Sequence, residues 1–552
     1  MKTPESPTGS VGSSNLFNGQ TEGINASAGL TLTRAFGDLS TKTSARVLIE
    51  HQDDKRVTAN ADVALVGGIP DLDAFSTLQN TSTEEKIRSQ GYYLTTDLDY
   101  GERYIVSALA RRDGSSLFGS EQRWHWYYRA SGAWRMSAET WWPFVNTVSE
   151  FKLRYSRGTA GGRPEFADRF EVFNLGTSGI TLGTLGNVFL RPEKTTEQEF
   201  GIDAVALERV SLNLSYAKQR TVDQLIQVPL PALFGFSGQW QNAGTLEGHT
   251  YEGTLDAHLI QTDKVRWGLT FIADRSRNRL VEYDRPCHSE GLLGNRCAGQ
   301  VLGQMWGQRL WQSYEDLPAK HANSLDAFAI NDDGLLVPVG VGNTYRNGVT
   351  GGVTDSLWGT TVTIDGTNYA WGMPQRVLDA TGQPARVLIG DANPDMNWGV
   401  SSQLRVGQLN VYALIGGQIG GHVYNSTKQR MFQYSRSREE DQDGKPEELK
   451  KPSTYYTGAL YNGNLASQWF VEDATYTKLR EVSVRFGLTP RQLPVLSRLG
   501  MERVLLAAIG RNLHEWTNYT GYDAEVGNVI ERRDNFGFPT YRTFTFSVEI
   551  EF

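Results

Sequence analysis

The stretch TFTFSVEIEF at residues 543–552 alternates strictly between apolar and polar side chains. Its apolar residues are Phe544, Phe546, Val548, Ile550 and Phe552. Successive side chains of a β-strand point to opposite sides, so this period of two predicts a strand with one apolar and one polar face. A strand of this kind, about ten residues long, suits a wall between lipid and water.

The same alternation recurs through the chain and predicts fifteen strands, or sixteen with a weaker one at 56–66. The fifteen strands are expected at 22–36, 40–51, 89–100, 103–113, 123–138, 147–158, 199–206, 210–216, 251–259, 265–273, 397–407, 409–424, 474–488, 501–513 and 543–552. Short connections alternate with long ones, and the long loops are expected at about 159–192, 222–247, 280–395, 425–473 and 515–539. This layout predicts an all-β fold, a transmembrane antiparallel β-barrel.

Composition supports a barrel wall over a helical membrane protein. Of 552 residues, 39% are hydrophobic and 11% aromatic, the mean hydropathy is -0.42, and no run reaches the roughly 18 apolar residues of a spanning helix. Aromatic residues gather at strand ends, where rings suit the headgroup level. The net charge of -8 argues against a nucleic-acid partner.

The remaining domain organisation follows from local composition. Residues 1–20 are polar and are expected to be disordered, without the apolar segment of a secretory signal, and residues 21–552 are expected to form the barrel. Cys287 and Cys297 are the two cysteines, and they are either a loop-closing disulfide or two unrelated thiols.

Seven stretches, taken together and in order, resemble the SusC/RagA-type TonB-dependent outer-membrane transporters over about residues 89–552. They are RRDGSSLFG at 111–119, LRPEKTTEQEFGID at 190–203, VPLPALFGFSGQWQNAGTLEGHTYEGTL at 228–255, GDANPDMNWG at 390–399, GGQIGGHVYN at 416–425, FVEDATYTKLREVSV at 470–484 and GRNLHEWTNYTGYDAEV at 510–526. The resemblance implies the barrel part of a TonB-driven importer in the outer membrane of a Gram-negative-type bacterium. Its substrate class would be oligosaccharide or oligopeptide.

The resemblance also implies partners and parts that this sequence does not show. A family member has a 22-stranded barrel around an N-terminal plug, a SusD-like lipoprotein lid and the TonB complex. About sixteen strands and no plug indicate a partial barrel, so we expect an incomplete or poorly paired seam between the strands at 22–36 and 540–552. The alternatives are a truncated fragment without transport activity and, less favoured, a passive porin.

The C-terminal strand also resembles the signal by which the barrel-assembly machinery recognises its clients. The residues concerned are Phe544, Phe546, Val548, Ile550 and Phe552. The simpler interpretation is a last strand that faces lipid, and both can hold together.

The sequence does not indicate an enzyme, a cofactor or a metal centre. His514-Glu515 is not followed by the second histidine of a zinc motif, and the pair Gly340 and Gly342 lacks the third glycine of a dinucleotide loop. An acidic run in the loop 425–473 partly resembles a calcium loop, but a solvated loop is the favoured interpretation. Its residues are Glu439, Glu440, Asp441, Asp443, Glu447 and Glu448.

An importer needs aromatic rings and polar groups where its ligand enters. The candidate ligand contacts are the loop aromatics Phe234, Phe236, Trp240, Trp306, Trp311, Tyr314, Tyr455 and Tyr456. Each is also explained by packing within its loop. Charged residues on the polar face are expected to line the lumen, among them Lys152, Arg154, Asp256 and Arg266.

Overall fold

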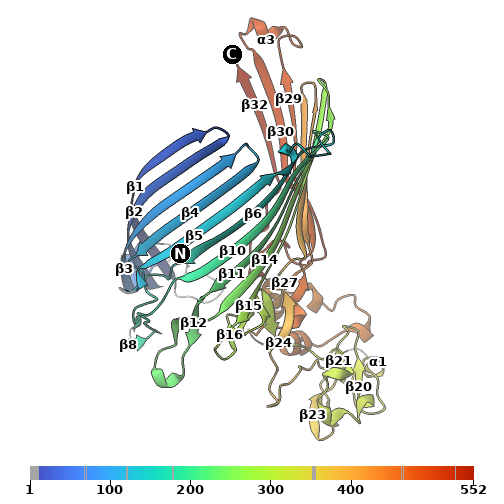
Figure 1. Cartoon of the computed structure of the whole chain (residues 1–552). Coiled ribbons are helices and arrows are strands. Elements are labelled where there is room, and N and C mark those ends of the chain that lie inside the picture. Colours follow the sequence, from blue (N-terminus) through green and yellow to red (C-terminus); the bar gives the residue numbers. More distant parts are fainter. Residues whose placement is uncertain are drawn as a thin grey trace.

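The computed structural model of the chain contains one large antiparallel sheet that curves around an open side (Figure 1). It describes residues 12–66, 69, 71–119, 122–176, 179–350, 353, 356–461, 463, 465–528 and 530–552, with the side chains of 175 and 176 left out. Within these residues, no helix has the length and apolar character needed to cross a bilayer.

The large sheet has sixteen strands in the described residues, of which the short β18 (Gln300–Val301) pairs only with β15. The other fifteen pair antiparallel with their neighbours in chain order. They are β1 (Ser13–Phe36), β2 (Leu39–Ala64), β3 (Phe75–Tyr100), β4 (Tyr104–Ser115), β5 (Trp124–Arg135), β6 (Val148–Gly162), β10 (Glu193–Ala206), β11 (Val210–Val222), β14 (Thr245–Gln261), β15 (Val265–Glu282), β25 (Met396–Val406), β26 (Leu409–Ile419), β29 (Tyr476–Leu488), β30 (Arg503–Thr517) and β32 (Thr543–Glu551).

The fifteen expected strands correspond to these fifteen, with two corrections near the N-terminus. The segment 56–66 is not a separate strand, because β2 runs unbroken from Leu39 to Ala64 and pairs with β1 over its whole length. Residues 13–20 belong to β1 and are not disordered, whereas residues 1–11 lie outside the described residues. Both errors arose where polar side chains occupy both faces of a long strand, so that hydrophobic alternation does not mark it.

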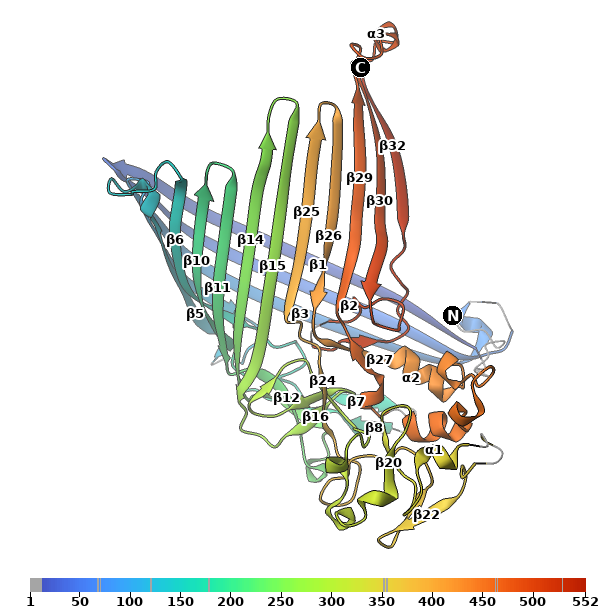
Figure 2. The ribbon, with the colours of Figure 1, turned by 90° about the vertical axis from the view of Figure 1, so that its right-hand side faces the viewer.

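Short turns and long loops occupy opposite ends of the wall. The expected long loops are observed at 163–192, 223–244, 283–395, 420–475 and 518–542, all at the lower end in Figure 2. The turns at the other end include 37–38, 207–209 and 407–408. The antiparallel order and the alternating connections are therefore those predicted from the sequence.

The long loops contain small sheets and short helices. Their strands are β7 (Phe173–Gly176), β8 (Gly179–Leu182), β9 (Thr184–Leu185), β12 (Leu225–Pro229), β13 (Gly238–Asn242), β16 (His288–Glu290), β17 (Gly294–Arg296), β19 (Gln304–Gly307), β20 (Phe328–Ile330), β21 (Leu336–Pro338), β22 (Thr361–Ile364), β23 (Thr367–Ala370), β24 (Val387–Asp391), β27 (His422–Asn425), β28 (Val471–Asp473) and β31 (Arg533–Asp534). The α-helices of these loops are α1 (Tyr345–Gly348) and α2 (Ser426–Gln433), while α3 (Val495–Arg498) lies at the short-turn end, between β29 and β30.

The first and last strands of the wall are free edges. Among the described residues, β1 pairs only with β2 and β32 only with β30, and the two strands lie on opposite sides of the opening (Figure 1). The expected incomplete seam is confirmed. The unpaired backbone N–H and C=O groups of these two strands would find no hydrogen-bond partners in lipid. The two edges are therefore the part of the wall with the highest free-energy cost in a bilayer.

The largest buried cluster lies in the loops, away from the wall. It joins 283–395 to 420–475 through aromatic side chains, including Trp371, Tyr424, Phe432 and Tyr455, which are each fully buried. Cys287 and Cys297 form a disulfide that closes a turn at the start of the first of these loops, which is the first of the two alternatives that the sequence left open. The two long loops thus form a packed unit of their own beside the wall.

Candidate functional site

The polar face of the wall carries charged side chains that pair across strands. Lys152 Nζ lies 2.8 Å and Arg154 Nε 2.9 Å from Asp203 Oδ2, because β6 and β10 place Lys152 opposite Asp203. Thr270 donates to Asp256 at 2.5 Å, and Arg266 is on the same face as Thr270 by alternation along β15. The four charged residues expected to share one face therefore do so.

The opposite face of the wall is apolar and has aromatic residues near both ends. At the long-loop end, the stacked rings of Trp126 and Tyr128 lie 6.1 Å apart. At the short-turn end, Tyr104 stacks on Trp134 with ring centroids 6.4 Å apart. This arrangement matches the two aromatic belts of a wall that meets lipid.

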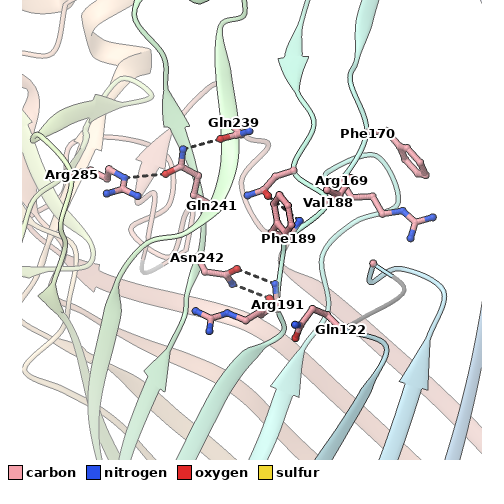
Figure 3. A pocket seen from close by; sticks show the side chains of 12 residues that line it. Gln122, Arg169, Phe170, Val188, Phe189, Arg191, Gln239, Gln241, Asn242 and Arg285 are labelled. Carbon is pink, nitrogen blue, oxygen red and sulfur yellow. Dashed lines mark hydrogen bonds between the residues drawn. The ribbon is translucent and has the colours of Figure 1, made fainter.

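A cavity of about 860 Å³ opens between four connections at the long-loop end (Figure 3). Its walls come from the β4–β5 connection, the segment before β10, the strand β13 and the residues after β15. The lining residues are Gly119, Gln122, Arg169, Phe170, Asn187, Val188, Phe189, Arg191, Gln239, Gln241, Asn242 and Arg285.

The cavity is held in shape by hydrogen bonds between its own walls. Asn242 accepts from the backbone N–H of Arg191 at 2.9 Å and donates to the carbonyl oxygen of Arg191 at 2.8 Å. Asn187 donates to the carbonyl oxygen of Trp240 at 2.9 Å, and β13 pairs parallel with β9. Because the two segments are fixed to each other, the cavity is preformed and needs little ordering to receive a ligand.

The cavity lining is cationic and rich in hydrogen-bond donors. Among the described residues it contains Arg169, Arg191 and Arg285 and no carboxylate, while Arg285 pairs with the adjacent Asp284 at 3.0 Å. Arg191 pairs with Asp223 at 2.7 Å, and Arg285 donates to Gln241 at 2.9 Å. Burial, reinforced by the neighbouring Arg123, lowers the pKa of Arg169, which nevertheless stays charged at neutral pH. The lining can therefore bind oxygen-rich or anionic groups.

Two rings stand beside these donors and were not among the expected ligand contacts. Phe189 is 79% exposed, and Phe170 lies under the guanidinium of Arg169, 4.5 Å from its ring centroid. Phe189 directly precedes the motif that begins at Leu190, which was the one available signal for it. The cavity thus joins apolar ring surface to several converging donors, which is the make-up of a ligand site.

Comparison with known proteins places this geometry in a family. The family model described as "TonB dependent receptor-like, beta-barrel" matches residues 4–414, well over half of the chain. The chain belongs to this family of TonB-dependent receptors. Among solved structures, the RagAB peptide transporter matches with a TM-score of 0.70 at 15% identity, covering 97% of this chain and 56% of that chain. This likeness confirms the barrel fold.

Curated relatives are longer than this receptor barrel. TonB-dependent receptor P3 of Formosa agariphila is 25% identical over 498 residues, which is 86% of this chain and 47% of that protein. SusC of Bacteroides thetaiotaomicron is 26% identical over 224 residues, 36% of this chain and 22% of that protein. The chain spans about half the length of the first of these relatives.

Some of the expected aromatic contacts of the receptor barrel are accessible. Phe234 is 57% exposed at the tip of the hairpin β12–β13, near Phe236, and Tyr314 is 44% exposed. Trp240 and Trp306 are half-buried. Trp240 follows Gln239 on β13, and its carbonyl oxygen is part of the cavity's hydrogen bonding. None of these five side chains lines the cavity itself.

Three other expected contacts are corrected by their burial. Trp311 is 1% exposed, Tyr455 0% and Tyr456 6%. Their rings pack inside the loop unit, where Tyr455 lies 5.8 Å from Trp358 and Trp311 lies 5.9 Å from Phe328. They stabilise the loops and present no ring face to a ligand.

Two residues of the acidic run of the receptor barrel pair with lysines. Glu439 lies 2.6 Å from Lys428, and Glu447 contacts Lys450. Within the described ranges, no three histidine, cysteine or acidic side chains converge as they would around a metal ion. The structure therefore gives no support for the calcium interpretation of this loop.

Proposed function

We propose that the chain forms the barrel wall and the ligand-contacting loops of an outer-membrane, TonB-dependent importer of nutrients. The observation that carries the proposal is the preformed cavity at the long-loop end, with three arginines, several amides and the exposed ring of Phe189. Oligosaccharides and oligopeptides both offer oxygen acceptors and flat apolar surface to such a site. The structurally similar RagAB is a peptide transporter, which makes the peptide class the first to test.

The same proposal assigns partners to the two ends of the wall. A SusD-like lipoprotein would cover the loop unit, and the TonB complex would act from the opposite side in the complete receptor. Charged residues on the polar face, including Lys152, Arg154, Asp256 and Arg266, would line the lumen. By itself, a wall with free edges at β1 and β32 does not seal a channel, so transport is proposed for the complete receptor.

A double substitution in the cavity tests the ligand site. F189A/R285Q removes one ring face and one guanidinium, and we expect at least about a tenfold loss of affinity for the ligands that the unaltered protein retains. Binding to a glycan array and to a tetrapeptide library measures the loss. The matched control is Phe538→Ala, which removes another loop ring, 91% exposed and outside the cavity.

Three results would contradict this proposal. Equal ligand retention by F189A/R285Q and the unaltered protein would remove the cavity as the ligand site. If the unaltered protein retains no ligand from the glycan array or the tetrapeptide library, the alternative of a truncated fragment without independent activity is favoured. A stable conductance in planar bilayers, unaffected by any ligand, would favour a passive porin.

The C-terminal strand is proposed as the signal for the barrel-assembly machinery. In β32, Phe544, Phe546 and Val548 are each more than 60% exposed, and Ile550 and Phe552 continue the same face. Deleting Phe552 is expected to lower the amount of protein in the outer membrane several-fold, while Thr545→Ala on the polar face should leave it unchanged. Quantitative blotting of outer-membrane fractions measures this, and an undiminished level after the deletion would leave only a lipid-facing strand.

A further inference from the structure

The apolar face of the wall contains a groove that is separate from the cavity between the loops. Its volume is about 680 Å³, and it crosses β10, β11, β14 and β15. Its floor is one row of cross-strand neighbours, in the order Ile202, Leu214, Gly253 and Ala273. The two small residues leave the space that larger side chains would fill.

Aromatic rings border this groove on its long-loop side. The next row of paired residues is Phe200, Tyr216, Tyr251 and Arg275. The rings of Tyr216 and Tyr251 lie 4.9 Å apart. The groove is therefore a largely apolar channel that ends at an aromatic border, where Arg275 and Asp395 are among the residues that line it.

A basic patch continues from that border towards the long loops. Arg275, Arg277 and Arg279 alternate with Ser276 and Asn278, so all three guanidinium groups stand on the apolar face of β15. Lys218 and Arg220 lie two strands away, on β11, in the same cross-strand rows as Arg277 and Arg279. The residue of β14 that pairs with Lys218 also pairs with Arg277, and the one that pairs with Arg220 also pairs with Arg279.

Two arginines of the patch form no ion pair among the described residues, although Glu247 is the cross-strand neighbour of Arg279. Arg277 pairs with Asp391 at 2.7 Å and with Asp395 at 3.2 Å, and Arg220 contacts both Glu247 and Glu282. Arg275 and Arg279 are exposed and form no ion pair within the described part of the chain. Guanidinium groups beside an apolar groove can bind a ligand that has both an anionic and an apolar part.

We propose that this surface binds a membrane lipid with a phosphorylated headgroup. The acyl chain lies in the groove over Gly253 and Ala273, and the phosphate binds Arg275 and Arg279, as guanidinium groups bind phosphate oxygens through paired hydrogen bonds. The apolar face of a receptor barrel meets lipid, and its aromatic border marks the depth of the headgroups. The phosphate then lies in the leaflet on the side of the long loops.

The geometry favours a lipid over a free anion. Inorganic phosphate would use the arginines alone and leave the groove unfilled, whereas an uncharged lipid would leave Arg275 and Arg279 unpaired in the headgroup layer. A phosphorylated lipid fills the groove and pairs the arginines at once, through the bidentate contacts that guanidinium groups form with phosphate.

Three variants of the protein, extracted from outer membranes and delipidated, separate these possibilities. R275Q/R279Q removes both free guanidinium groups, Gly253→Leu fills the groove, and Arg266→Gln is the matched control on the polar face of the same strand. The probes are phosphatidic acid in mixed micelles, diacylglycerol with the same acyl chains, and inorganic phosphate. Native mass spectrometry counts the retained lipid molecules, and the shift in melting temperature reports phosphate.

We expect the unaltered protein and Arg266→Gln to retain phosphatidic acid in preference to diacylglycerol. R275Q/R279Q should reduce this retention at least about tenfold, since two charge-assisted contacts are lost, and Gly253→Leu should reduce it as well. Equal retention by R275Q/R279Q, or of diacylglycerol and phosphatidic acid, would overturn the proposal. A response to inorganic phosphate as strong as that to the lipid would leave an anion site only and also overturn it.

Discussion

Replacing Lys451 with methionine is expected to destabilise the loop unit by about 1–3 kcal/mol, because it removes the buried cation that two partly exposed carboxylates share. The Lys451 side chain is only 4% exposed, and its Nζ lies 2.9 Å from Asp332 and 2.7 Å from Asp333. Tyr455 donates to the same Asp333 oxygen at 2.6 Å. These contacts join the loop 283–395 to the loop 420–475, so both loops should open together.

Limited proteolysis and hydrogen exchange of the two loops measure this loss. The control is Lys450→Met, the adjacent and more exposed lysine, whose pair with Glu447 should contribute no more than about 0.5 kcal/mol. Adding Asp333→Asn to Lys451→Met should restore part of the stability by removing one unpaired charge. Equal protection of both loops in Lys451→Met and Lys450→Met would contradict the expectation.

The pH dependence of the same contact gives a second readout. Burial lowers the pKa of Lys451, but the hydrogen bond and charge of Asp333, with those of Asp332, outweigh burial and hold this pKa above its usual 10.5. Because the pKa of Lys451 is higher in the folded state than in the unfolded state, its ion pairs stabilise the fold fully at a pH below the unfolded pKa. This stabilisation is lost as the pH rises through the pKa of the folded state. The difference between the unaltered protein and Lys451→Met should therefore shrink at strongly alkaline pH.

Gly417→Ala is expected to break the pairing of β26 with β29 and to cost about 3 kcal/mol. A Cβ at Gly417 would lie 2.0 Å from the carbonyl oxygen of Tyr476 and 3.0 Å from Cα of Thr477. Both are backbone atoms of the partner strand, so no side-chain rotation relieves the clash. The two strands would have to separate where the sheet meets the loop unit.

Urea unfolding of the sheet in detergent micelles, followed by circular dichroism, measures this cost. The matched control is Gly132→Ala in β5, where an added Cβ meets no heavy atom within 4 Å. That substitution should be neutral or slightly stabilising, because alanine restricts the unfolded chain. Similar urea midpoints for the two variants would show that β29 can move aside at little cost.

The sequence predicted the wall well because the information for it is local. Alternation with a period of two, as in 543–552, sets which residues share a face, and the lengths of the connections set the antiparallel order. It failed within 51–56, where HQDDKR interrupts the alternation although β2 continues through it. There the partner strands, and not the local pattern, hold the strand together.

The ligand cavity could be predicted only in part. The loop of Phe234 and Phe236 was identified, yet Phe189 and Arg169 line the cavity because four connections, distant in the sequence, meet at one end of the wall. Tyr455 was expected to contact ligand, although it is buried against the 283–395 loop. An aromatic residue in a long loop has the same sequence signal whether it packs or binds.

The sequence by itself determined the amphipathic strands, their order and the face that each side chain occupies, since neighbouring residues fix all three. It predicted the strand at 265–273 but not its continuation in β15 through Arg275, Arg277 and Arg279. Only the tertiary structure decided that Gly253 pairs with Ala273 beneath those arginines, and that the wall has free edges at β1 and β32. Cavities, grooves and edges depend on strand register and on contacts between distant segments, which local periodicity does not specify.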